Sequence, residues 1–194
     1  MRRIGLFLLA LLLTGNVSAQ AYQWQVDPIH TNFYFEIRHT YAAVRGQFNE
    51  FTARVDFDPD KPETARFEFE IRVDSIDTNN GKRDTHLRSD DFFAASTYPT
   101  IRFVSSKVSK SGDTTYLVEG KLTIKDVSRE VVLPFVYHGT KANPLKKGEL
   151  IAGMDARLSL DRLAWHVGSG QFAAMGVVGK DLDILLTVEM GRPE

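Results

Sequence analysis

The chain has 194 residues, with 24 lysines and arginines against 25 aspartates and glutamates, and it contains no cysteine. Such a near-neutral mixture of charges does not indicate nucleic acid or an anionic membrane surface as the main partner. Because cysteine is absent, thiol chemistry, thiolate metal sites and disulfides are excluded, and stability must come from a packed core.

The N-terminal residues have the layout of a secretory signal peptide. Two arginines follow the initial methionine, an apolar run too short to span a bilayer comes next, and small residues then lead to Ala19 and Ala21. Cleavage after either alanine fits, and we favour the later one. The chain then divides into a signal peptide at 1–21 and one domain at 22–194, and we expect a periplasmic protein.

The mature chain continues with segments in which apolar and polar residues alternate. Phe33, Phe35 and Ile37, for example, are separated by Tyr34 and Glu36. A period of two is typical of a strand with one buried and one wet face. The same period recurs at 51–57 and 67–73, and less regularly at 100–107, 115–125, 130–137, 150–160 and 182–190.

Turn-forming residues separate these segments at 58–62, 111–113 and 143–148. Two regions do not have a strand pattern. Residues 80–95 predict a short helix that turns Leu87, Phe92 and Phe93 inward, and residues 163–177, rich in glycine and alanine, predict a loop or short helix.

The pattern predicts an all-β fold, a single antiparallel β-barrel of about eight strands with one or two short helices. A β-sandwich fits the pattern nearly as well. A barrel of about eight strands is either filled by its own side chains or holds one small ligand. Periodicity alone favours the filled interior.

The sequence shows no catalytic constellation and no set of metal ligands. The histidines are scattered without a His-Glu-x-x-His pair, and no serine lies in a Gly-x-Ser-x-Gly turn. His39 continues the apolar face of Phe33 and Ile37, where a histidine is more often satisfied by a neighbour than bound to a ligand. The segment 83–93 combines charges, a histidine and two rings, and such a segment either closes one end of a barrel or lies solvated on its surface.

A series of ordered motifs resembles the YceI-like family and spans essentially the whole mature chain. The matching segments are 26–31 (Val-Asp-Pro-Ile-His-Thr), 46–48 (Gly-Gln-Phe), 75–78 (Ser-Ile-Asp-Thr), 83–87 (Arg-Asp-x-His-Leu), 91–93 (Asp-Phe-Phe), 98–103 (Tyr-Pro-x-Ile-x-Phe), 120–124 (Gly-Lys-Leu-Thr-Ile) and Arg162. Two places depart from the family pattern. Asp126 stands where glycine is common, and 163–168 replaces the usual Asp-Phe-Gly.

The resemblance implies a lipocalin-like barrel, periplasmic or secreted, that binds a long-chain isoprenoid lipid such as an isoprenoid quinone or a polyprenyl phosphate. It therefore favours an open cavity over a filled interior. The side chains expected to line that cavity are Phe33, Phe35, Phe51, Phe69, Ile71, Phe93, Phe103, Ile124 and Trp165. The residues expected at the lipid head are Arg38, His39 and His86, although alternation places Arg38 on the outer face unless a bulge turns it.

Two other functions stay open at this point. An enzyme acting on the bound lipid would need His39 or His86 as its general base. An envelope stress or interaction protein would have a filled barrel and work through its outer surface. We expect no cofactor, no catalytic residue, no stable membrane insertion and a lipid as the partner; a homodimer is compatible with the sequence.

Overall fold

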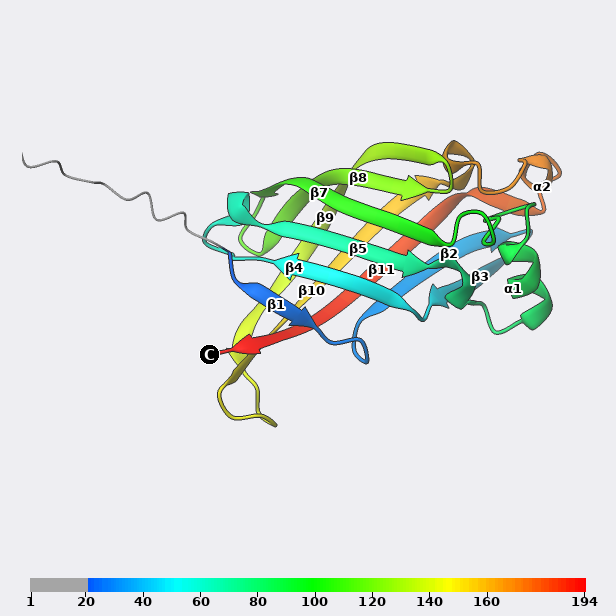
Figure 1. The fold of residues 1–194 in the computed structure, drawn as a ribbon. Helices are drawn as coiled ribbons and strands as arrows, with labels where there is room; N and C mark the ends of the chain where they lie inside the picture. Colours follow the sequence, from blue (N-terminus) through cyan, green and yellow to red (C-terminus); the bar gives the residue numbers. More distant parts are fainter. Residues whose placement is uncertain (1–20) are drawn as a thin grey trace, which may run out of the picture.

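The computed structural model describes residues 21–194 (Figure 1). The predicted signal peptide therefore lies outside the described residues, apart from Ala21. The strands are β1 (Gln23–Val26), β2 (Asn32–His39), β3 (Ala42–Phe48), β4 (Phe51–Asp56), β5 (Arg66–Arg72), β6 (Ile76–Asp77), β7 (Thr100–Lys110), β8 (Thr115–Ile124), β9 (Val127–Ala142), β10 (Glu149–Asp161) and β11 (Val178–Pro193). The helices are α1 (Gly81–Arg88) and α2 (Gln171–Ala174), with 3-10 turns at Pro62–Thr64, Val73–Ser75 and Arg162–Trp165.

The strands form one closed antiparallel barrel. β5, β7, β8, β9, β10 and β11 pair in that order, and β11 then pairs with β2 along its first part and with β1 near its end. β3 lies beside β2 and β4 beside β1, while β6 and β5 pair with β3 and β4 respectively. β1 and β2 share one place in the ring, as do β3 and β4, and β5 and β6. The barrel therefore has eight strand positions, and the predicted closed barrel is confirmed. The β-sandwich alternative is wrong.

Sequence alternation located the long strands but missed three short or weakly patterned ones. β1 and β6 are only four and two residues long, and on the inward face of β3 the small residues Ala42 and Gly46 weaken the apolar pattern of Val44 and Phe48. Their place in the sheet comes from pairing with β11, β4, β2 and β3 rather than from a hydrophobic stripe.

The predicted helix at 80–95 is shorter than expected. Asn80 caps it by accepting a hydrogen bond from the Arg83 amide, and the helix ends at Arg88. Ser89 then adopts an extended backbone, and its hydroxyl donates to the carbonyl of His86 at 2.7 Å, which satisfies one of the free carbonyls of the last turn. Phe92 and Phe93 follow on turns and pack inward, as predicted.

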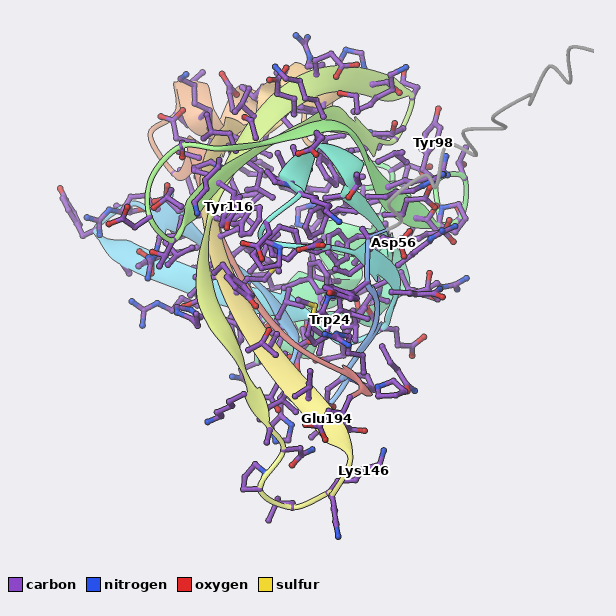
Figure 2. The ribbon with its side chains drawn as sticks, turned by 90° about the vertical axis from the view of Figure 1, so that its left-hand side faces the viewer. Trp24, Asp56, Tyr98, Tyr116, Lys146 and Glu194 are labelled. Carbon is purple, nitrogen blue, oxygen red and sulfur yellow. The ribbon has the colours of Figure 1, made fainter. Side chains whose placement is uncertain are left out.

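One half of the barrel interior is filled, and we call it the packed half. It is the half that β1 and β4 close, and Figure 2 views the molecule from this end. The ring of Phe57 lies 5.3 Å from the rings of Tyr116 and Tyr137 and 5.6 Å from that of Phe135, measured between centroids. The indole of Trp24 donates to the carbonyl of Phe57 at 2.9 Å. The buried side chains that define the packed half are Trp24, Val55, Phe57, Phe67, Tyr116, Phe135, Tyr137 and Met190.

Candidate functional site

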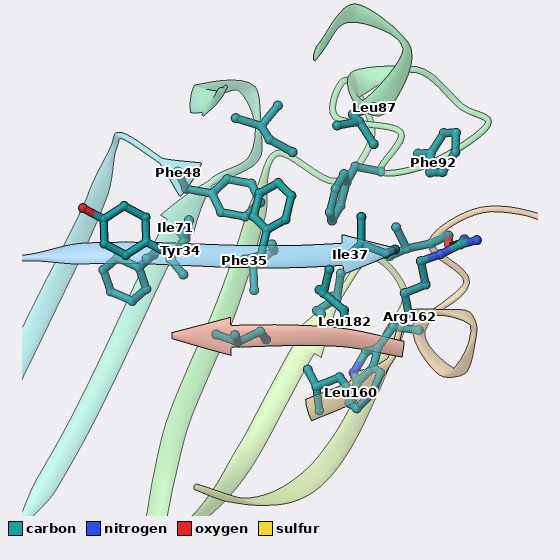
Figure 3. Close-up of a pocket in the computed structure, with 18 of the residues that line it drawn as sticks. Tyr34, Phe35, Ile37, Phe48, Ile71, Leu87, Phe92, Leu160, Arg162 and Leu182 are labelled. Atoms are coloured by element: carbon teal, nitrogen blue, oxygen red, sulfur yellow. Dashed lines mark hydrogen bonds between the residues drawn. The ribbon is translucent and has the colours of Figure 1, made fainter. Parts of the chain in front are cut away.

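The other half of the barrel, on the side of α1 and α2, encloses a cavity of about 410 Å³ (Figure 3). We call it the hollow half. Its volume lies within the range of about 300–1,000 Å³ that is usual for small-molecule sites. At its inner end the wall is formed by Phe69, Phe103, Leu133 and Leu186, which also border the side chains of Phe67 and Phe135 in the packed half.

The cavity wall is almost entirely apolar. The aromatic side chains that line it are Phe33, Tyr34, Phe35, Phe48, Phe69, Phe92, Phe93, Phe103, Trp165 and Phe172. The aliphatic ones are Ile37, Val44, Ile71, Ile76, Leu87, Ile101, Leu122, Ile124, Val131, Leu133, Leu158, Leu160, Val167, Val177, Val178, Leu182, Ile184 and Leu186. The remaining lining residues are His39, Thr78, Arg83, His86 and Arg162, so the described wall carries basic groups and one threonine hydroxyl but no carboxylate.

Two glycines hold large rings of the wall in place. Gly46 faces Phe35 across β2 and β3, and a Cβ atom built at Gly46 would lie 2.4 Å from the Phe35 ring. A Cβ at Gly120 would lie 2.6 Å from the Phe103 ring. Because both contacts are far closer than van der Waals distance, only glycine lets these rings lie against the neighbouring strand. The two glycines therefore shape the wall without contributing a side chain to it.

The loops at the mouth of the cavity are joined by two charged residues, Lys125 and Asp126, of the turn between β8 and β9. The Lys125 ammonium donates to the carbonyls of Phe92 and His166, at 2.9 and 2.8 Å. Asp126, at one of the two places that depart from the family pattern, meets the ring of His166 at 3.2 Å. The backbone amide of Asp126 and the His166 ring lower the pKa of that carboxyl group. These contacts join the segment after α1 to the segment after β10.

An aromatic cluster forms the rim next to α1. The ring of His86 lies 5.0 Å from that of Phe92, and Phe92 stacks on Phe172 of α2 at 6.2 Å. His86 Nε2 also lies 3.0 Å from a carboxylate oxygen of Asp91. His86 and Asp91 are both exposed, so this pair is solvated and adds little to stability.

Arg162 is the one charged side chain of the cavity wall that is almost fully buried, with 6 % of its surface exposed. Its Nε donates to the carbonyl of Gly179 at 2.8 Å, and its Nη1 donates to the carbonyl of Val167. Nη2 is buried and has no hydrogen-bond partner among the described residues. Burial lowers the pKa of the guanidinium because the charged form loses water.

Most of the residues predicted for the site lie on the cavity wall. They are Phe33, Phe35, His39, Phe69, Ile71, His86, Phe93, Phe103, Ile124 and Trp165. Whether they contact a ligand remains a prediction.

Two predicted residues do not line the cavity. Phe51 is half-buried and packs on Phe33, with 4.8 Å between ring centroids, at the start of β4. Arg38 is on the outer face of β2, where its guanidinium donates to the carbonyl of Tyr41. A bulge on β2 would have turned Arg38 inward, but the irregularity in this strand pair lies on β11, between Val178 and Leu182.

Sequence reasoning missed Arg162 and the lining from the later strands. Leu182, Ile184 and Leu186 alternate along β11 and carry the signal that identified Phe33 and Phe35 on β2. For Arg162 the available signal was a motif match alone, since its burial depends on Val167 and Gly179 from two other segments.

Among residues 21–194, no helix has the length and apolar character needed to cross a membrane.

Comparison with known proteins gives consistent matches. The sequence model of the YceI-like domain matches residues 24–190. A UPF0312 protein of Photorhabdus laumondii is 31 % identical over 188 residues, which cover 96 % of this chain and 94 % of that protein. A UPF0312 protein of Shewanella denitrificans is 34 % identical over 125 residues, covering 64 % of this chain and 65 % of that relative.

Solved structures share the fold. BcnA of Burkholderia cenocepacia superposes with a TM-score of 0.77 at 27 % identity, over 85 % of this chain and 99 % of BcnA. The Campylobacter jejuni YCEI protein gives 0.72 at 28 % identity, over 81 % and 90 %. A domain of Saccharophagus degradans described as polyisoprenoid binding gives 0.63 at 12 % identity, over 88 % and 98 %, which shows the shared fold alone.

Proposed function

The chain belongs to the YceI-like domain family, and on that premise we propose that it binds and carries a long-chain isoprenoid lipid inside the barrel. The observation that carries this proposal is the cavity of about 410 Å³ with its apolar wall. The Saccharophagus domain, described as polyisoprenoid binding, has the same fold and makes an isoprenoid a reasonable first ligand.

Such a wall suits a long apolar chain for energetic reasons. Each CH₂-sized group moved from water into an apolar site contributes about 0.8 kcal/mol. Fifteen to twenty such groups would supply about 12–16 kcal/mol. Micromolar binding, which needs about 8 kcal/mol, then remains after several kcal/mol are lost with translational freedom. No directional bond is needed along the chain, so selectivity would depend on cavity length and on the polar groups at the mouth.

We also propose that the protein acts in the periplasm. The support is the signal-peptide layout of the first residues. An isoprenoid is insoluble, and a carrier that encloses it would keep it dispersed in an aqueous compartment between two membranes.

The two alternative functions receive less support. A filled barrel acting through its surface does not agree with the hollow half. An enzyme would use His39 or His86, both of which lie at the cavity wall and are exposed. Replacing both histidines with alanine would abolish turnover under that alternative, whereas a carrier would still take up lipid.

Native mass spectrometry of the protein purified from its own periplasm, followed by organic extraction, tests the proposal. We expect a stoichiometric isoprenoid, and a protein mass that corresponds to a chain beginning at Gln20 or Tyr22. A bare protein that also takes up no added isoprenoid quinone or polyprenyl phosphate would contradict the carrier function. A protein recovered only in the cytoplasm with its first residues intact would contradict the location.

A further inference from the structure

The charged groups on the cavity wall are all of one sign. Arg83 and Arg162 line it, while no aspartate or glutamate does among the described residues. Arg83 donates its Nε and Nη2 to the hydroxyl and carbonyl of Thr78, at 2.7 and 2.6 Å. Neither arginine lies within 4.0 Å of a described carboxylate oxygen. The cavity wall therefore carries positive charge without a paired carboxylate on the wall itself.

The acidic residues nearest in the chain are engaged elsewhere. Asp161 directly precedes Arg162, but its carboxylate meets the ammonium of Lys180 at 3.1 Å. Asp84 directly follows Arg83, and its carboxylate accepts hydrogen bonds from the amide and hydroxyl of Thr78. The Thr78 hydroxyl in turn accepts from Arg83, so Asp84 is linked to Arg83 only through it. Asp161 attracts Arg162 without forming an ion pair with it, so the protein compensates these two cations only in part.

Such an arrangement is unusual because a buried charge costs several kcal/mol unless it is paired and fully hydrogen-bonded. Arg162 uses two of its nitrogens on carbonyl groups and leaves Nη2 without a partner among residues 21–194. Gly168 provides the space beside it, since a Cβ atom there would lie 2.4 Å from Nη1. Figure 3 shows Arg162 among the apolar side chains of the wall.

From this charge distribution we infer that the bound lipid has an anionic head, a phosphate monoester or a carboxylate, and that Arg162 is the residue that selects it. This inference rests on the proposed lipid-binding function. The head lies at the end of the cavity near Arg162, Arg83 and α1, and the apolar chain extends toward Phe103 and Leu186. The ring of Phe92, 5.8 Å from the Arg162 Cζ, moves aside as the head reaches Nη2.

A neutral head would satisfy this site only in part. A quinone carbonyl or an alcohol oxygen accepts one hydrogen bond from Nη2 but adds no negative charge to balance the guanidinium. Arginine pairs best with planar or tetrahedral oxyanions, whose two oxygens match its fork of donors. Hydrogen bonds to charged groups are also stronger than neutral ones, which corresponds to a preference of about ten-fold or more.

The test compares three ligands of equal chain length on the delipidated full chain: a polyprenyl phosphate, a polyprenyl carboxylate and the corresponding polyprenol. Affinity is measured by tryptophan fluorescence, using Trp165 on the cavity wall. We expect both anions to bind the wild-type protein about ten-fold or more tightly than the alcohol. Equal affinities for all three would overturn the inference while leaving lipid binding intact. If none of the three ligands bound, the result would instead contradict the proposed lipid-binding function.

Variants then assign the selectivity to one residue. Arg162→Gln should bind the alcohol as wild type does and lose the preference for the anions, whereas Arg162→Lys should keep part of it. Arg157→Gln, an exposed arginine of β10, the strand that directly precedes Arg162, is the matched control and should change nothing. Retention of the full preference in Arg162→Gln would overturn the role of Arg162. Inorganic phosphate at the same concentrations should not displace the lipid; displacement would indicate a site for the free anion instead.

Discussion

The packed half and the hollow half of this barrel share long strands, and both have aromatic side chains that point inward, but these side chains fill the interior only in the packed half. There the ring of Phe57 is surrounded by the rings of Phe67, Tyr116, Phe135 and Tyr137, at centroid distances of 5.3–5.9 Å. In the hollow half the aromatic rings share the wall with branched aliphatic residues of β10 and β11 and leave a cavity between them. The number of strands sets the width of a barrel, so side chains that do not fill that width leave open space.

This difference teaches that an eight-stranded barrel need not be wholly filled or wholly open. Both halves lie along the same continuous strand, β11, which pairs with β1 at one end and β2 at the other. The packed half supplies stability, and the hollow half gives up part of that stability to keep space for a ligand.

The largest expected effect is on stability in the packed half. Phe57→Ala removes a fully buried ring from a dense aromatic cluster and should lower the free energy of unfolding by about 3–5 kcal/mol. Leu182→Ala in the hollow half borders existing space and should cost less than about 2 kcal/mol, at the low end of buried leucine losses. Urea denaturation of the ligand-free protein measures both. Equal losses would show that the two halves are packed alike.

A smaller effect is expected when the hollow half is filled. Leu182→Trp places a ring in unfilled space, so the free energy of unfolding should change by less than about 1 kcal/mol while lipid uptake falls. Val55→Phe is the matched control in the packed half, where overpacking should cost about 1–3 kcal/mol and leave uptake unchanged. Denaturation and lipid titration are measured on the same samples. A Leu182→Trp protein that still takes up a full complement of lipid would argue that the cavity is not the binding site.

The smallest expected effect concerns the turn between β1 and β2, where the two halves meet. Asp27 and Glu189 lie 2.8 and 3.8 Å from His30 Nδ1. The hydrogen bond to Asp27 raises the pKa of His30 above its ordinary value of 6.5 and lowers the pKa of Asp27 below 3.8. The stabilisation from protonated His30 is therefore full below pH 6.5 and is lost as the pH rises through the raised pKa of His30. The stabilisation from ionised Asp27 is lost as the pH falls through the lowered pKa of Asp27.

An NMR titration of the His30 ring measures this contact directly. We expect a midpoint above 6.5 in the wild-type protein and a return toward 6.5 in Asp27→Asn. The Glu189→Gln variant should give a smaller downward shift, since that carboxylate is the more distant one. A midpoint that Asp27→Asn leaves unchanged would mean that the ring does not pair with Asp27 in solution.

Local sequence pattern could predict the barrel and much of its lining, because alternation along a strand directly determines which side chains face inward. Phe33, Phe35 and Phe69 follow this rule. Phe51 shows its limit, since an inward side chain can pack on a neighbouring ring rather than border the cavity. Alternation alone favoured a filled interior, and only the family resemblance predicted the hollow space. The burial of Arg162 could not be predicted, because it arises from contacts between segments far apart in the chain.

The pairing of β11 with both β1 and β2 also bears on how the barrel forms. These contacts join the last described strand to the first two, so the ring cannot close until residues 178–193 are available. Contacts of such long sequence separation make folding slow. During synthesis the emerging polypeptide therefore stays unclosed until its last strand is available, a state that would suit the export that we propose.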